Sequence, residues 1–205
     1  MDPEHRLVLS VVPGRRTTES VQAVVTDTQR RTGGRTMRLI TTDEYPAYEG
    51  AILDAYGVTV TPPRTGKQGR PKAPYKVPAP GLKYATVVKT REKGRVVKVD
   101  FRVVFGSEVS VRAALMTSPV SRAINTAFVE RQNGTDRHRN ARKGRKTYRF
   151  SKDWWFHEAA THFALYSYNF CWSVRTTEKD EAQFRLVAPD HCTAGKVSHS
   201  DIDHT

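Results

Sequence analysis

The sequence predicts an α/β fold with a parallel pair of strands near its N-terminus. Residues 6–12 are apolar and β-branched, and Pro13 and Gly14 stop the run, as is typical of a strand. Valines at helical spacing follow within 17–32, and residues 37–41 have the composition of a second strand. Strand, helix and strand in this order favour a βαβ unit, whose two strands lie parallel in one sheet.

The helix of this unit has a recognisable start. Thr17 can cap its first turn, and Glu19 supplies an acid there. The second strand leads to Asp43, so this carboxylate is expected at the carboxyl end of a parallel strand. A short helix is then expected from 45 to 56, closed by Gly57.

Residues 59–105 are predicted to form an extended loop followed by a β-hairpin. Its first part, 59–81, carries six of the eleven prolines and reads as an extended basic loop. Its second part is predicted to be a β-hairpin, with strands at 82–90 and 95–105 and a turn between them. Residues 107–124 have no clear pattern.

Two further helices are expected in the second half. One begins near Asn125, and a second is expected to be capped by Ser151. Aromatic residues recur at helical spacing along the second helix, and this stripe is predicted to pack in the core together with the three tryptophans. The stripe comprises Trp155, Ala159, Phe163, Tyr166 and Phe170, and the other tryptophans are Trp154 and Trp172.

The charge of the chain indicates a polyanionic partner. The 205 residues carry a net charge of +13, and 20 of the 34 Lys and Arg residues lie in 62–98 and 131–152. Clustered bases of this kind are typical of nucleic-acid binding, although a solvated basic face would have the same composition. No run of 18 apolar residues predicts a membrane span, and two cysteines suit a cytoplasmic protein.

Two carboxylates lie where a basic surface would not need them. Asp43 is expected at a strand end, and Glu130 early on a helix that leads into the basic run. Such acids are explained if divalent cations lie between them and a DNA backbone, because Mg²⁺ prefers oxygen ligands and paired ions can assist phosphodiester chemistry. From spacing alone, an acid in such a place is more often a helix cap or a surface charge.

Several short segments, in order, resemble one protein family. These are the segments TTDEYPAY at 41–48, FVERQN at 128–133 with Arg137, RFSK at 149–152, His157-Glu158, YNFC at 168–171 and Arg175-Thr176, preceded by 7–14 with Arg16. Together they resemble the catalytic domain of insertion-sequence DDE transposases, of the group of insertion sequence one. The Glu-Arg-x-Asn signature at 130–133 is the most specific part.

The resemblance implies an RNase H-like mixed sheet with flanking helices over residues 1–177, with 59–105 inserted and a divergent, flexible tail at 178–205. It implies metal-dependent DNA strand cleavage and strand transfer during transposition. Asp43 would be the second catalytic aspartate and Glu130 the catalytic glutamate, and both would hold Mg²⁺ or Mn²⁺. The partners would be DNA and further copies of the chain on DNA, in the nucleoid of the cytoplasm.

The same resemblance assigns a DNA-binding surface. Arg131 and Asn133 would order the catalytic helix or contact phosphates. Backbone phosphates would be bound by the basic residues that follow, which makes the affinity steeply salt-dependent. These residues are Arg137, Arg139, Arg142, Lys143, Arg145, Lys146 and Arg149.

One part of the family pattern is missing. The first catalytic aspartate belongs to a strand upstream of 7–12, so the resemblance implies an N-terminally truncated domain that lacks its first strand. Neither Asp2 nor Asp27 suits that role, because the resemblance places Asp2 in the hairpin that leads into Leu7 and Asp27 falls within the first helix. Two hypotheses therefore stay open, an impaired transposase and a non-catalytic basic DNA-binding relic, beside a weaker third, a basic ribosome- or RNA-associated protein. Whether the chain is an enzyme is left undecided.

Overall fold

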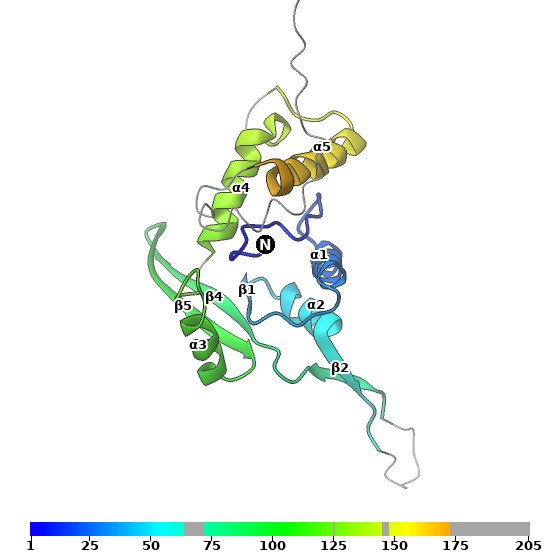
Figure 1. Cartoon of the computed structure of the whole chain (residues 1–205), viewed down its shortest axis with the longest axis vertical. Coiled ribbons are helices and arrows are strands. Elements are labelled where there is room, and N and C mark those ends of the chain that lie inside the picture. The colour runs from blue at the N-terminus through cyan, green and yellow to red at the C-terminus, as the bar shows by residue number, and fades with distance from the viewer. Residues whose placement is uncertain (64–71, 125, 145–147, 173–205) are drawn as a thin grey trace, which may run out of the picture. The chain divides into compact units, whose positions relative to one another are not determined.

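A three-stranded mixed sheet with the strand order β1-β4-β5 is the centre of the fold (Figure 1). Strand β1 (Ile40–Asp43) runs parallel to β4 (Tyr84–Glu92), and β4 is antiparallel to β5 (Arg95–Phe105). The computed structural model describes residues 1–63, 72–124, 126–144 and 148–172. The predicted α/β class, with a mixed sheet and flanking helices, is confirmed; the predicted tail at 178–205 lies outside the described residues.

Helices cover both faces of this sheet. On one face, α1 (Thr18–Arg31) and α2 (Ala47–Tyr56) bury Val21 and Ile52 against Tyr84. On the other, α3 (Glu108–Met116) buries Val111 against Ala85 and Val87. Neighbouring residues of β4 point to opposite faces, so one strand contributes to two separate apolar clusters.

The start of α1 is as the sequence predicts. The N-cap is Thr17, whose side-chain oxygen accepts a hydrogen bond from the backbone N–H of Ser20. In the middle of the helix, Asp27 forms ion pairs of 2.7 Å with Arg30 and Arg31, and only a fifth of the Asp27 side chain is exposed. Burial raises the pKa of Asp27, but hydrogen bonds, first that of Arg30, outweigh it and hold this pKa at about 2.

We expect Asp27→Asn to destabilise the protein by about 1 kcal/mol at pH 7. The folded state lowers the pKa of Asp27 from 3.8 to about 2, so its stabilising contribution is fully present above pH 3.8. That contribution is lost as the pH falls through about 2, so the difference in unfolding free energy should vanish there. Urea unfolding at several pH values measures it. Asp54→Asn, which removes an exposed carboxylate, is the control and should show no comparable loss.

The prediction of a strand at 6–12 is wrong. Leu7 forms a single bridge to Asp2, and the residues after it are not part of a sheet. The amide side chain of Asn169 donates to the carbonyl of Val8 and accepts from its N–H, both at 3.0 Å. A strand needs a series of backbone hydrogen-bond partners. Here the side chain of Asn169 supplies such partners to Val8 alone. The parallel partner of β1 is therefore β4, and the predicted βαβ unit is not formed.

The basic loop predicted at 59–81 is partly ordered into a ribbon. Strands β2 (Gly57–Val60) and β3 (Tyr75–Pro78) pair antiparallel. Pro78 lies at the end of β3, where a missing N–H costs little. Residues 64–71 lie outside the described residues. The short helix before the ribbon is confirmed as α2, and it ends where Gly57 adopts an extended backbone.

The predicted β-hairpin is confirmed as β4 and β5. Glu92 pairs with Arg95, and Lys93 and Gly94 between them have positive φ angles of 45° and 79°. Two consecutive residues with positive φ match the right-handed twist of the strands, so this two-residue turn joins β4 and β5 directly. The end of the hairpin beyond the core is exposed.

The second half of the described chain is helical. Helix α4 (Ala127–Arg139) is confirmed, and a short 3₁₀ turn, η1 (Ala141–Lys143), follows it. Helix α5 (Trp154–Tyr166) continues into a π-helical turn, η2 (Ser167–Cys171). The predicted cap at Ser151 is wrong, because Asp153 accepts the N–H of Phe156 instead. No helix in the described ranges is long and apolar enough to cross a membrane.

The aromatic stripe of α5 does not pack in the core. Its members are exposed, with Phe163 at 72% and Phe170 at 70%, and the tryptophans predicted as core are more than half exposed. Helix α5 instead buries the opposite side, where Thr161 is only 2% exposed. The spacing correctly predicts that the stripe forms one face of a helix. A second face of α5, that of Thr161, is also apolar enough to be buried, and this second face packs against α4.

Candidate nucleic-acid interface

Asp43 is the last residue of β1, and its carboxylate forms an ion pair with an arginine side chain. Arg16, from the segment before α1, donates from Nη2 to Oδ2 of Asp43 at 2.7 Å. The same guanidinium lies 4.3 Å from the centroid of the Tyr45 ring. Half of the Asp43 side chain remains exposed. This carboxylate therefore lies on the surface with one oxygen already paired.

Glu130 lies in the first turn of α4 and is paired in the same way. Lys89 of β4 donates to its Oε1 at 2.6 Å, and the hydroxyl of Thr126 donates to the same oxygen at 2.7 Å. The hydrogen bond from Lys89, followed by that from Thr126, lowers the pKa of Glu130 below its ordinary value. Lys89 also donates to Thr126, so three side chains form one polar cluster.

The two carboxylates lie beside neighbouring strands of the sheet. Asp43 is the ladder partner of Val87, and Lys89 follows two residues later on the same strand. Residues two apart in a strand point to the same face, so Lys89 shares the face of Val87, which packs with α3, whereas the Asp43 side chain is paired with Arg16 from the segment before α1. Because Lys89 pairs with Glu130, the two acids named from the sequence lie beside the paired strands β1 and β4, although 86 residues separate them.

The arrangement does not fit a two-metal centre. Such a centre places carboxylate oxygens around two divalent ions. Within the described residues no three His, Cys, Asp or Glu side chains come together. Asp43 and Glu130 each direct an oxygen to a cationic side chain, Arg16 and Lys89, which would oppose an added metal ion. The expected Mg²⁺ or Mn²⁺ site is thus not formed by these two residues as they lie here.

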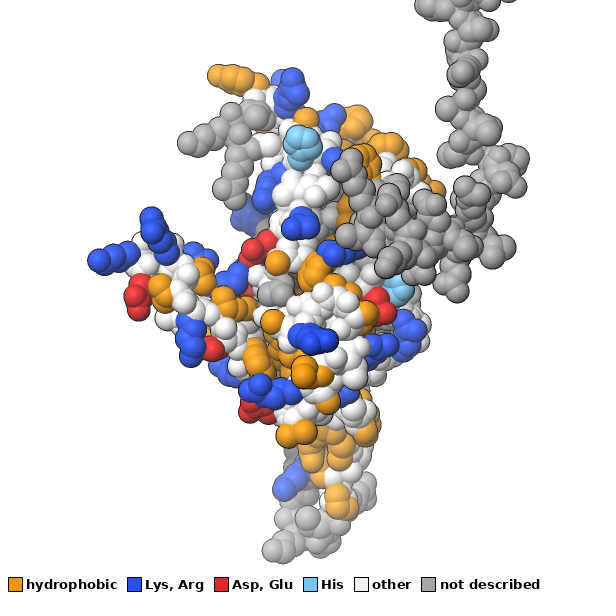
Figure 2. Space-filling view, turned by 60° about the vertical axis from the view of Figure 1, so that its left-hand side comes forward, with side chains coloured by type: hydrophobic (Ala, Val, Ile, Leu, Met, Phe, Trp, Pro, Cys, Tyr) orange, Lys and Arg blue, Asp and Glu red, His pale blue; other side chains and the backbone are white. Residues whose placement is uncertain are grey.

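Helix α4 presents the first of the predicted phosphate-binding residues to solvent. Arg131, Asn133 and Arg137 are exposed, and among the described residues no carboxylate pairs with either arginine. Lys and Arg side chains also clearly outnumber Asp and Glu on the face shown in Figure 2. These exposed guanidinium groups can donate to phosphate oxygens without first breaking an ion pair.

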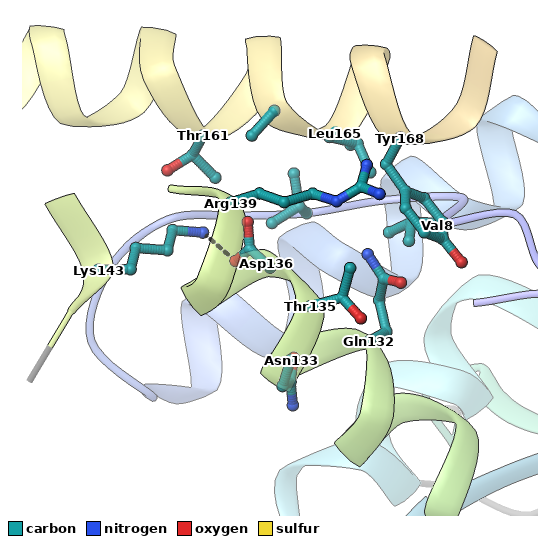
Figure 3. Close-up of a pocket in the computed structure, with 12 residues that line it drawn as sticks. Val8, Gln132, Asn133, Thr135, Asp136, Arg139, Lys143, Thr161, Leu165 and Tyr168 are labelled. Atoms are coloured by element: carbon teal, nitrogen blue, oxygen red, sulfur yellow. Dashed lines mark hydrogen bonds and ion pairs between the residues drawn. The ribbon is translucent and has the colours of Figure 1, made fainter. Parts of the chain in front are cut away.

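Two other predicted residues are used inside the protein. Lys143 of η1 forms a half-buried ion pair of 2.6 Å with Asp136 of α4. Arg139 lies between α4 and α5, with its guanidinium carbon 3.3 Å from the Trp172 ring centroid, and Figure 3 shows it extending toward Tyr168. A cavity of about 70 Å³ lies among these side chains. Their surroundings assign them to helix packing.

The remaining predicted residues follow η1. Arg142 is exposed and donates to the hydroxyl of Ser151 at 3.3 Å, and Arg149 is also exposed. Arg145 and Lys146 lie outside the described residues. Helix α4, η1 and the segment that follows thus supply four exposed arginines, which are Arg131, Arg137, Arg142 and Arg149.

The sequence did not identify the partners of the two acids. Lys89 has no local signal that sets it apart from Arg91 and Glu92, the other charged residues of β4. Its role depends on the pairing of β4 with β1 and on the position of α4. Arg16 lies within the segments that carry the family resemblance, but nothing near it indicates that Asp43 is its partner.

Comparisons with protein-family models, with curated proteins and with solved structures give no match for this chain.

Proposed function

We propose that this chain acts on the DNA of an insertion sequence as a polypeptide of the DDE transposase type, and that its RNase H-like sheet presents a DNA-binding surface. The observation that carries the proposal is the bond from Lys89 to Glu130, two ladder positions beyond the partner of Asp43. Through this hydrogen bond, Glu130 lies beside β4, the strand that pairs with β1 and its Asp43. The chain would then be found with DNA in the nucleoid.

The exposed arginines of α4 and its continuation support the same proposal. Arg131 and Arg137 lie on the helix that carries Glu130, so a DNA backbone bound along α4 would pass close to that acid. Guanidinium groups bind phosphate oxygens strongly and without regard to base sequence. Contacts of this type position the DNA, and base recognition would come from other groups.

A second candidate function is a DNA-binding protein without strand cleavage. The ion pairs of both acids favour it, because Arg16 and Lys89 already neutralise the carboxylates that would hold metal ions. In this case the acids stabilise the surface and the arginines bind the backbone. The family chemistry would need a further carboxylate and the release of both cations.

A combined binding and nicking assay tests the two candidates. We expect the 205-residue chain to bind duplex DNA, and Arg137→Ala to reduce the number of phosphate contacts by about one, seen as a shallower salt dependence. Arg35→Ala removes an exposed arginine away from α4 and is the matched control. An unchanged salt dependence in Arg137→Ala would contradict the proposed surface.

The nicking arm uses supercoiled plasmid with Mg²⁺ or Mn²⁺. Metal-dependent nicking that disappears in Asp43→Ala and Glu130→Ala would establish the transposase chemistry for this chain. Salt-sensitive binding without nicking, unchanged in both variants, would select the second candidate. Absence of DNA binding at low salt would contradict both.

A further inference from the structure

We propose that the exposed face of α5 is a self-association surface, on which α5 of a second copy of this chain packs antiparallel. Its contact residues, here called the α5 seam, are Phe156, Ala159, Phe163, Tyr166 and Phe170. The inference is independent of DNA binding and is tested without DNA.

The α5 seam is exposed and continuous. Phe156, Tyr166, Phe163 and Phe170 have between 56% and 72% of their surface exposed. Neighbouring rings also touch, with centroids 4.8 Å apart for Tyr166 and Phe170. Contiguous apolar patches of this kind are rare on monomers and mark interaction surfaces.

The spacing of the α5 seam is that of helix pairing. Its members are separated by three, four, three and four residues, which keeps the first four on one narrow side of α5, and Phe170 follows on the π-helical turn η2 beside Tyr166. Helices packed side by side use this repeat, because each side chain then enters a gap on the facing helix. The other side of α5 is already occupied, since Thr161 and Leu165 face α4 (Figure 3).

The sizes of the seam residues suit a second copy of the same helix. In an antiparallel pair, Ala159 lies opposite Phe163 of the second copy, and Phe156 lies opposite Tyr166. A small residue facing a large one fills the layer evenly, whereas parallel pairing would place two alanines together and two phenylalanines in the next layer. The antiparallel pair is symmetric and closed, so it makes a dimer and not a fibre.

The charge of the segment disfavours nucleic acid as the partner of this face. Residues 153–172 contain two acids and no Lys or Arg, in a chain whose net charge is +13. A stacking surface for single-stranded nucleic acid would need cations beside its aromatic rings. The face of α5 therefore favours an apolar protein surface over a polyanion.

The area is also sufficient. At about 200 Å² for a whole aromatic side chain, the four seam aromatics and the adjacent Trp155 leave about 650 Å² exposed on each copy. A stable protein interface of standard size buries about 800 Å² on each partner. The surrounding polar atoms of α5 supply the remainder.

Sedimentation of the full chain at high salt without DNA tests the proposal. We expect a reversible dimer, and we expect Phe163→Glu to weaken it at least about 100-fold, because a charge is then buried against Ala159 of the second copy. Phe163 is exposed, so the fold should be retained, and far-UV circular dichroism checks this. Val109→Glu places the same charge at an exposed residue of α3 and should leave the dimer unchanged.

A mixing experiment tests the antiparallel pairing. Ala159→Lys and Phe163→Glu chains should each be monomeric alone, but their mixture should dimerise about tenfold or more tightly, because the introduced ammonium of one chain would then face the introduced carboxylate of the other. Failure of the mixture to associate would overturn the pairing.

Three results would overturn the proposal itself. One is a wild-type chain that is monomeric at every concentration. Another is a dimer that Phe163→Glu leaves intact. The third is a monomer whose tryptophans are shielded from acrylamide or whose affinity for single-stranded DNA falls in Phe163→Glu, which would assign the face to the chain's own residues or to nucleic acid.

Discussion

Raising the salt concentration from 50 to 200 mM is expected to weaken the binding of duplex DNA about 100-fold. Four exposed arginines, named above on α4, η1 and the segment that follows, are available for phosphates. Each phosphate neutralised contributes about 0.9 to the slope of log affinity against log salt, so four contacts give about −3.6. Over a fourfold change in salt this slope amounts to about two powers of ten.

Fluorescence anisotropy of a labelled duplex at several salt concentrations measures this slope. The double variant Arg131→Ala with Arg137→Ala should lower it to about −1.8. Asn133→Ala carries no charge change on the same helix and should leave the slope as it is. A wild-type slope near zero would show that the arginines do not contact phosphates, and would leave the net charge as a matter of solubility only.

Replacing Ile52 by Ala is expected to lower the free energy of unfolding by about 3 kcal/mol. Ile52 of α2 is 1% exposed and packs with Val21 and Tyr84, so its removal leaves a cavity between α1, α2 and the sheet. Alanine has the higher helix propensity, so a loss of stability cannot come from the helix itself. A loss of this size is a large share of the total stability of a domain.

Urea unfolding followed by circular dichroism gives this value. Ile52→Val removes one methyl group at the same position and should cost about 1 kcal/mol. Val109→Ala, at an exposed residue of α3, should change stability by no more than about 0.5 kcal/mol. An Ile52→Ala protein with the wild-type midpoint would show that α2 is not packed on the sheet.

The local elements were largely predictable. Thr17 caps α1 as expected, Gly57 follows the end of α2, and Lys93-Gly94 turns the hairpin. Each of these depends on residues within a few positions of one another. The short-range chemistry of caps and turns is written in the sequence, so it could be predicted without the rest of the chain.

Pairings between segments that are distant in the sequence were not predictable in the same way. Residues 6–12 have the composition of a strand, but Val8 is paired by the side chain of Asn169, 161 residues away. Residues 59–81 predict a loop because their prolines disfavour a central strand, although an edge position tolerates Pro78 of β3. In both cases the outcome depends on whether a partner strand is present at that place.

The same division applies to the candidate site. The sequence alone identified Asp43, Glu130 and the exposed arginines of α4 as residues of interest, because acids in a basic surface are unusual and because their surroundings resemble a family. Only the tertiary structure decided that Arg16 and Lys89 neutralise the two acids, and that Arg139 and Lys143 serve packing. Residue type and spacing determine which chemistry a side chain can perform, whereas its charge partners and its exposure depend on which distant segments pack beside it.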